Sequence, residues 1–196
     1  MWAKLVSYII HPAIVPVLGV IIAKFTLPYH IPDQLFYFVA LYVFAGTYVF
    51  PLFIVIGLYK LNFVQSIHLK TAKERFYPFL VSALFYFLTA KAVLQFHFPI
   101  ELSKFIFAGC AIIATQFILL KTTKVSAHAS AASAMLTWLI CLSFDYNLNM
   151  LFLIAMATLA LGVVSSARLY LKAHSPSQII TGIGIGALAV IVFYWG

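Results

Sequence analysis

Acidic side chains are nearly absent from this sequence of 196 residues, which has four of them against twelve lysines and arginines. The four acids, Asp33, Glu74, Glu101 and Asp145, are spread along the chain. A hydrolase that works with two metal ions gathers several carboxylates around them, so this scarcity argues against such an enzyme. We therefore expect neither a metal ion nor a cofactor.

Cysteine and charge are also scarce. Cys110 and Cys141, the two cysteines, lie in apolar stretches, where cysteine usually behaves as a small hydrophobic residue. The sequence therefore predicts neither a disulfide framework nor a zinc site. Charged residues make up 8% of the chain, against about 25% in soluble domains. The net charge of +8 reflects missing acids rather than a basic face, and we expect no nucleic-acid partner.

Long apolar runs are abundant, and 65% of the residues are hydrophobic. Seven segments approach or reach the roughly 20 residues that a helix needs to cross a bilayer. They cover about residues 5–25, 35–59, 76–96, 104–120, 128–144, 149–166 and 177–195. Such lengths favour helices over the short alternating strands of a barrel. We predict an all-α bundle of six or seven transmembrane helices, six if one segment is re-entrant or interfacial, forming one domain over residues 1–196.

The N-terminal apolar run fits two interpretations, a signal peptide and a first membrane helix. The pair His11-Pro12 interrupts the run, Pro16 follows, and no small-x-small cleavage site ends it. We therefore expect the run to be the first membrane helix of a multi-pass protein of the cell membrane.

Three short polar clusters interrupt the apolar segments, at residues 70–78, 124–128 and 167–178. Two membrane crossings separate each cluster from the next, so all three should emerge on one membrane face. A charged side chain beside hydrocarbon costs about 3 kcal/mol or more unless it lines a polar cavity. We therefore expect the clusters to converge on one anion site that contains two histidines.

Most basic residues are predicted to lie on that same face. Nine of the twelve are assigned to it: Lys4, Lys60, Lys70, Lys73, Arg75, Lys121, Lys124, Arg168 and Lys172. The positive-inside rule would make this face cytoplasmic, but several of these cations are also candidates for anion binding, so the orientation stays open. We interpret four of the lysines as anchors for lipid headgroups, namely Lys60, Lys121, Lys124 and Lys172. His11 and His97 have no partner motif and are interpreted as structural.

The C-terminal cluster contains a predicted helix start. Ser175 is the expected N-cap, Pro176 the first helical residue, and Gln178 the residue that closes a capping box. His174 then lies just ahead of a helix N-terminus, where main-chain N–H groups favour anions. Arg168 offers a planar fork of donors suited to phosphate. A neutral His174 is a candidate nucleophile if another group orients its ring.

The middle cluster has a related arrangement. Ser126 and Ala127 are small residues at the predicted start of the fifth apolar segment. They leave main-chain N–H groups accessible at a second helix N-terminus facing the site. His128, directly after them, is a candidate general acid for a leaving oxygen.

The first cluster is the least regular of the three. The run Thr71–Glu74 resembles another capping box, which would place Arg75 in the first turn of the third segment. Pro78 fits poorly inside that helix, so we expect the helix to begin nearer Tyr77.

Together the clusters resemble the three motifs of the type-2 phosphatidic acid phosphatase superfamily of membrane lipid phosphatases. The motifs of that family read Lys-x6-Arg-Pro, Pro-Ser-Gly-His and Ser-Arg-x5-His-x3-Asp. Arg168 and His174 keep the spacing of the third motif, with Ala167 in place of its serine, and residues 126–128 keep Ser and His of the second. The first departs most, because Arg75 and Pro78 are not adjacent and the nearest lysines do not have the family spacing. The resemblance covers about residues 68–196.

The resemblance implies metal-independent hydrolysis of a lipid phosphate or diphosphate. His174 would attack phosphorus and form a phosphohistidine, and His128 would protonate the leaving alcohol. The phosphoryl oxygens would be bound by Arg75, Arg168 and a lysine, Lys70 or else Lys73, with Ser126 assisting. The substrates implied are phosphatidic acid, phosphatidylglycerol phosphate, undecaprenyl diphosphate or a phosphorylated lipid A, reached laterally among the membrane lipids.

Gln178 is the most consequential departure, because the family has Asp there to orient and stabilise the imidazole of His174. In a serine protease, replacing the equivalent Asp by its amide lowers turnover about 10⁴-fold. The protein is therefore expected to be a slower enzyme, to have a compensating partner, or to bind phosphate without cleaving it. Two alternatives stay open: an undecaprenyl-diphosphate phosphatase specifically, and a non-catalytic lipid-phosphate binder or transporter. The oligomeric state also stays open.

Overall fold

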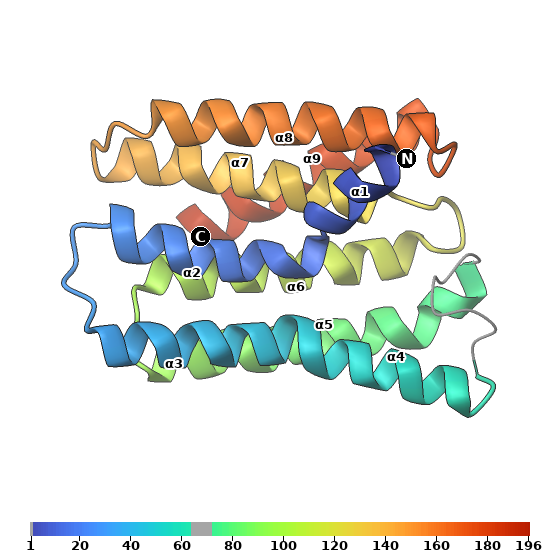
Figure 1. Ribbon diagram of the computed structural model, residues 1–196, viewed down its shortest axis with the longest axis horizontal. Helices are drawn as coiled ribbons and strands as arrows, with labels where there is room; N and C mark the ends of the chain where they lie inside the picture. The colour runs from blue at the N-terminus through green and yellow to red at the C-terminus, as the bar shows by residue number, and fades with distance from the viewer. Residues whose placement is uncertain (1, 64–71) are drawn as a thin grey trace.

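The computed structural model describes residues 2–63 and 72–196, and these residues form a bundle of helices without a strand (Figure 1). Seven helical stretches are long and apolar enough to cross a membrane. They are Trp2–Thr26, Asp33–Lys60, Glu74–Gln95, Ile100–Leu119, Ala127–Asp145, Leu151–Tyr170 and Pro176–Trp195. The predicted all-α, multi-pass architecture is confirmed, with seven spans rather than six.

The first span is broken where the sequence has His11-Pro12. It consists of α1 (Trp2–Ile9), a 3-10 turn η1 (Pro12–Ile14) and α2 (Val15–Thr26). Proline lacks the N–H that would continue the hydrogen bonding of α1, and His11 adopts an extended conformation. As a result, α1 is set at an angle to α2 and contacts α8 (Leu151–Tyr170) near the end of the bundle (Figure 1).

The second span is also irregular, with a π-helical turn η2 (Ala45–Val49) between α3 (Asp33–Phe44) and α4 (Phe50–Lys60). This turn packs against α5 (Ala72–Gln95), which crosses it closely. A Cβ at Gly46 would lie 2.1 Å from the Oγ1 of Thr89, so only glycine permits this approach.

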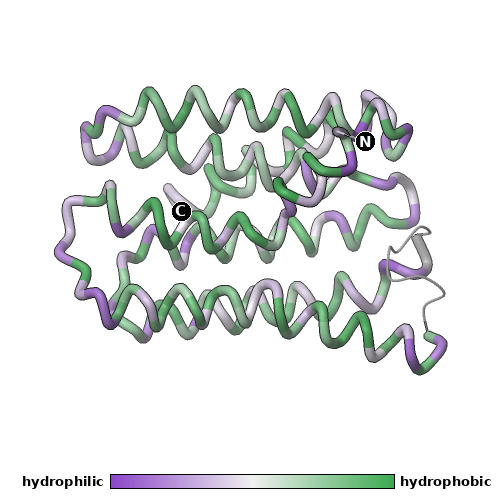
Figure 2. The backbone as a smooth tube through the Cα atoms, viewed as in Figure 1, coloured by the Kyte–Doolittle hydropathy of each residue, from purple (hydrophilic) through white to green (hydrophobic). Residues whose placement is uncertain are grey.

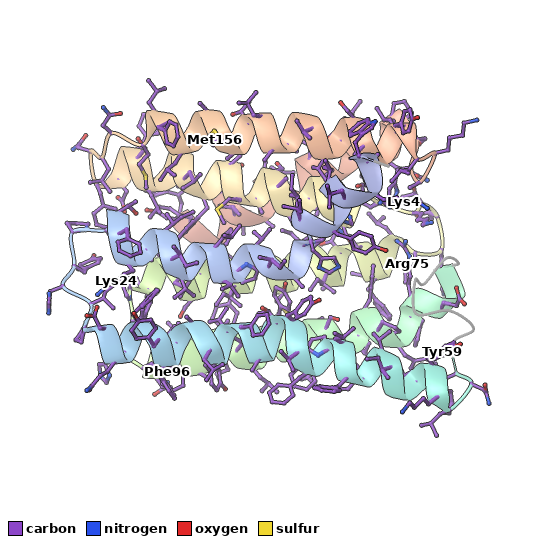
Figure 3. The ribbon with its side chains drawn as sticks, in the orientation of Figure 1. Lys4, Lys24, Tyr59, Arg75, Phe96 and Met156 are labelled. Atoms are coloured by element: carbon purple, nitrogen blue, oxygen red, sulfur yellow. The ribbon has the colours of Figure 1, made fainter. Side chains whose placement is uncertain are left out.

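Helix α5 continues through Pro78, and the expectation that it begins near Tyr77 was wrong. A proline inside a helix removes one hydrogen bond, here the one to the carbonyl of Glu74. This position is close to the start of the helix, so most of the hydrogen-bond ladder is unaffected. Arg75 therefore lies on helical backbone, at the same end of the molecule as the other polar clusters (Figure 3).

The C-terminal half is formed by α6 (Ile100–Leu119), α7 (Ala127–Asp145), α8 and α9 (Pro176–Trp195). Helix α7 is the most enclosed of the seven spans and packs closely along α9. A Cβ at Gly186 would lie 2.2 Å from the carbonyl oxygen of Ser130, and one at Gly182 would lie 2.9 Å from that of Ser126. These small residues allow the backbones of α7 and α9 to approach closely.

Polar residues gather at the two ends of the bundle, and apolar residues cover its middle (Figure 2). One end, to the right in Figure 1, carries the start of α7, the α8–α9 turn and the start of α5. The three predicted clusters therefore share one face in all their described parts. Three of the four acids, Asp33, Glu101 and Asp145, lie at the opposite end, so their carboxylates do not reach this face.

Candidate active site

His174 lies in the turn between α8 and α9, and 8% of its surface is exposed. Its Nδ1 atom is 3.0 Å from the main-chain oxygen of Lys124 and 3.3 Å from the side-chain Oε1 of Gln178. Both neighbours are acceptors: the Lys124 atom is a carbonyl oxygen, and Gln178 Oε1 is an amide oxygen that also accepts the N–H of Ser175. Nδ1 therefore carries the hydrogen, and Nε2 keeps its lone pair.

The local sequence explains how this turn is held. Ser175 caps α9, and the predicted capping box with Gln178 is present, since each side chain accepts the main-chain N–H of the other residue. The main-chain N–H of Ser126 donates to the carbonyl of Gln178 at 3.3 Å. The starts of α7 and α9 are thereby tied together, which brings the middle and C-terminal clusters into contact.

His128 lies in the first turn of α7, two residues after the N-cap Ser126. Its Nε2 atom is 3.0 Å from the main-chain oxygen of Ser7 in α1. A carbonyl oxygen can only accept, so Nε2 carries a hydrogen here and Nδ1 is the remaining ring nitrogen. The Ser126 hydroxyl is fully buried and accepts the N–H of Ala129, so it serves the start of the helix.

Arg168 lies in the last turn of α8. Its Nη1 donates to the hydroxyl of Ser7 at 3.3 Å. Its Nε is buried and has no hydrogen-bond partner within the described parts of the chain. A buried guanidinium donor without a partner is costly, and an anion bound beside it would satisfy it.

The cations of the site lie within electrostatic range of one another. The pKa of Lys124 is lowered, first by burial and then by the positive charges of Arg75 and Arg168. The side chain of Arg75 also lies over the ring of Phe79, with 5.9 Å between the guanidinium carbon and the ring centre. Such a group of like charges favours a bound anion, because the anion offsets their mutual repulsion.

The same charges act on His174. Burial is the main cause that lowers its pKa, and Arg168, Arg75 and Lys124 lower it further, while the hydrogen bond to the Lys124 carbonyl opposes them. The resulting pKa of about 4 keeps the imidazole neutral at neutral pH. His128 lies within electrostatic range of both Arg168 and His174, so the two predicted histidines belong to one site.

Of the residues predicted for the site, the structure brings together His174, His128, Arg168, Arg75, Gln178 and Ser126. Lys70 lies outside the described residues, as does the side chain of Lys73. Lys124, interpreted from the sequence as a headgroup anchor, is partly buried beside the other cations. Its position directly before the second motif was the one available signal.

Two further residues were not predicted for the site. The ring of His11 meets that of His128 edge to face, with 5.9 Å between ring centres, and Ser7 contacts both His128 and Arg168. His11 also meets Tyr48 at 5.9 Å. These contacts come from the first span, far from the motifs in sequence, and no motif marks them.

The comparisons with known proteins bear on this half of the bundle. Residues 102–196 match the PAP2 superfamily. The predicted resemblance to the type-2 phosphatidic acid phosphatases is thereby confirmed, over the segment that carries His128, Arg168 and His174. No curated protein and no solved structure matches the chain. PAP2 superfamily members are phosphatases, so the match supports hydrolysis of phosphate esters.

An apolar cavity of about 70 Å³ is lined in part by Ala127, the residue that precedes His128. Its lining includes Ala127 and Ala131 of α7, Pro12 of η1 and Gly109 of α6. Tyr86 and Gln116 are its polar members, and the rest of the lining is apolar. The cavity therefore borders the start of α7, the helix that carries His128.

Proposed function

We propose that this protein is a membrane phosphatase that hydrolyses lipid phosphates or diphosphates through a phosphohistidine, without a metal ion. The observation that carries the proposal is the state of His174. Its Nδ1–H is held by the Lys124 carbonyl, its low pKa leaves the ring neutral, and it lies within electrostatic range of Arg168, whose buried Nε has no partner among the described residues.

In the first step, the lone pair on Nε2 of His174 attacks phosphorus, and the bond from phosphorus to the leaving oxygen breaks. His128, protonated at Nδ1 as well as at Nε2 when it acts as the general acid, gives its Nδ1 proton to that oxygen as it leaves. In the second step, water attacks the phosphohistidine while His128 takes up its proton. Inorganic phosphate departs, and both imidazoles return to their starting state.

The cations stabilise the charge that develops on the phosphoryl oxygens. Arg168 contributes through its unpartnered Nε, and Arg75 and Lys124 lie close enough to act on the same charge. We keep Lys70 as a further candidate, on the resemblance alone. Ser126 contributes indirectly, by capping the helix that carries His128.

A lipid substrate is favoured over a soluble phosphate ester by the surroundings of the site. The site lies at the end of a bundle of seven helices that are long and apolar enough to cross a membrane, and an apolar cavity is lined in part by Ala127, the residue before His128. A lipid could present its phosphate at the rim while its hydrocarbon remains in the apolar layer. Phosphatidic acid, phosphatidylglycerol phosphate, undecaprenyl diphosphate and phosphorylated lipid A all meet this description, and we place the protein in the cell membrane.

The test is phosphate release by the purified protein in detergent with EDTA present. The wild type should release phosphate from at least one of these lipids, and His174→Asn should lower the rate by roughly 10⁴-fold or more. Asparagine can still donate to the Lys124 carbonyl, so this change removes the nucleophile while it preserves the turn. The matched control is His97→Asn, at an exposed histidine between α5 and α6, which should retain full activity. An active His174→Asn protein would refute the nucleophile.

A second candidate function, lipid-phosphate binding or transport without cleavage, is favoured by Gln178. The amide accepts a hydrogen bond but supplies no negative charge to a developing imidazolium. If the wild type binds such lipids and releases no phosphate from any of them, this second function replaces the first. Rapid denaturation in alkaline detergent after addition of substrate radiolabelled in its phosphate would separate the two, because only the enzyme accumulates a phosphoryl group on protein that survives base and is lost in acid.

A further inference from the structure

The PAP2 match begins at residue 102, yet two residues within it, His128 and Arg168, are hydrogen-bonded to Ser7 of α1. Helix α1 has eight residues and is followed by the break at His11-Pro12. The break directs α1 toward α8 rather than along α2. The rings of Trp2 and Tyr170 pack together, with 5.4 Å between ring centres. Helix α1 is therefore fastened at the end of the bundle where the site lies (Figure 1).

Ser7 contacts His128 through its main chain. The Ser7 carbonyl accepts the Nε2–H of His128 at 3.0 Å, which fixes the ring nitrogen that carries the hydrogen. A general acid needs one nitrogen held and the other directed at the leaving oxygen. With Nε2 held by Ser7, Nδ1 is the nitrogen left to exchange a proton with the substrate.

Ser7 contacts Arg168 through its side chain. The hydroxyl donates its own hydrogen to the carbonyl of Ala3 at 2.9 Å, which leaves its lone pairs for the Nη1–H of Arg168 at 3.3 Å. The hydrogen bond from Nη1 to Ser7 fixes the plane of the Arg168 guanidinium. The unpartnered Nε then has a defined direction.

We propose that Ser7 is a positioning residue of the phosphatase site, which holds the general acid through its carbonyl and the phosphate-binding arginine through its hydroxyl. The inference rests on the proposed function for the roles of His128 and Arg168. It extends the functional unit beyond the matched family segment to the first span. His11, at the break between α1 and α2, supports the same arrangement, because its ring packs edge to face on the ring of His128.

The hydroxyl contact is tested with a double-mutant cycle. Ser7→Ala should lower kcat/KM for phosphate release roughly 10- to 100-fold, the usual cost of one hydrogen bond to a charged group. Ser7→Thr, which keeps a hydroxyl, should restore most of that loss. In an Arg168→Lys background, Ser7→Ala should change the rate less than about twofold, since lysine has no planar fork to orient. The control is Leu5→Ala, an exposed position of α1, with no expected loss.

The carbonyl contact is tested by removing residues 2–9. Both Ser7 contacts are then lost, and the rate should fall at least about tenfold below that of Ser7→Ala. Thermal unfolding of each variant checks that the bundle is intact. If the shortened protein does not fold, the double-mutant cycle still decides the proposal.

The proposal is overturned if Ser7→Ala retains wild-type kcat/KM, or if its loss is equal in the wild-type and Arg168→Lys backgrounds. Failure of the proposed function gives a different result, namely no phosphate release by the wild type. In that case the cycle is read with orthovanadate as the probe, by calorimetry. Ser7→Ala should then weaken vanadate binding roughly 10- to 100-fold, and an unchanged affinity would overturn the positioning role independently of catalysis.

Discussion

The Nδ1 atom of His174 lies 3.0 Å from the carbonyl oxygen of Lys124, closer than the 3.3 Å that separates it from Oε1 of Gln178. A main-chain carbonyl thus provides the nearer acceptor at the place where the PAP2 pattern relies on Asp. The ring is oriented by two acceptors, and neither of them carries a charge. Orientation and charge stabilisation, which one carboxylate supplies together, are separated in this chain.

This separation predicts the effect of Gln178→Asp. A carboxylate would strengthen the hydrogen bond as positive charge develops on His174, by about 1 kcal/mol more than the neutral amide. We expect kcat to rise roughly fivefold to tenfold, measured as phosphate release at saturating lipid. Gln178→Leu should lower kcat, because it removes both the acceptor and half of the capping box. An unchanged rate in Gln178→Asp would show that the Lys124 carbonyl suffices and that Gln178 only caps α9.

The low pKa of His174 predicts the acid side of the pH profile. Burial and nearby cations disfavour the protonated ring, so the nucleophile stays available as the pH falls, until it is protonated near pH 4. We expect the acid limb of kcat/KM to lie well below 6.5, the usual pKa of histidine. Lys124→Met removes one of the charges that lower the pKa, so the limb should move to higher pH. A limb that stays in place, or moves to lower pH, would contradict this electrostatic account.

The group of cations predicts stabilisation by phosphate analogues. Orthovanadate should bind between Arg168, Arg75 and Lys124 and raise the thermal unfolding midpoint in proportion to the logarithm of its concentration. At about a hundred times its Kd, the gain in unfolding free energy should be about 2.7 kcal/mol. Lys124→Ala should weaken the effect, whereas Lys60→Ala, at an exposed lysine of the same end, should not. If the two variants have equal effects, Lys124 does not bind the phosphate analogue, and the earlier interpretation of Lys124 as an anchor for lipid headgroups would stand.

The sequence was sufficient to predict the bundle and the shared face of the clusters, because both follow from the lengths and number of apolar segments. The capping box at Ser175 was also predictable, since helix starts are encoded locally. The reach of α5 through Pro78 was not, because a proline near a helix start is compatible with two starting points.

The partners of the site histidines could not be predicted for a different reason. The acceptors of His174 and His128 include the carbonyls of Lys124 and Ser7, and main-chain atoms have no sequence signature. Ser7 and Arg168 are 161 positions apart, so only the packing of α1 on α8 brings them together. The motifs therefore pointed to the two imidazoles but not to the main-chain and side-chain groups that contact them.

The packing of α7 on α9 yields a prediction with a matched control in one helix. Gly186 faces α7, where a Cβ would lie 2.2 Å from the Ser130 carbonyl, whereas a Cβ at Gly184 would meet nothing within 4 Å. Gly186→Ala should force the helices apart and cost about 1–3 kcal/mol of unfolding free energy. Gly184→Ala should be neutral or stabilise by up to about 1 kcal/mol, because alanine favours the helix.

The consequence for activity follows from where these helices begin. Helix α7 carries His128, α9 follows His174, and their starts are tied by the bond from Ser126 to Gln178. A shift of about 1 Å between the two histidines can cost roughly 10²-fold in rate. Gly186→Ala should therefore lose far more kcat than Gly184→Ala, compared well below both unfolding midpoints. Equal rates for the two variants would show that the two imidazoles are held by their own turns, independently of the contact between α7 and α9.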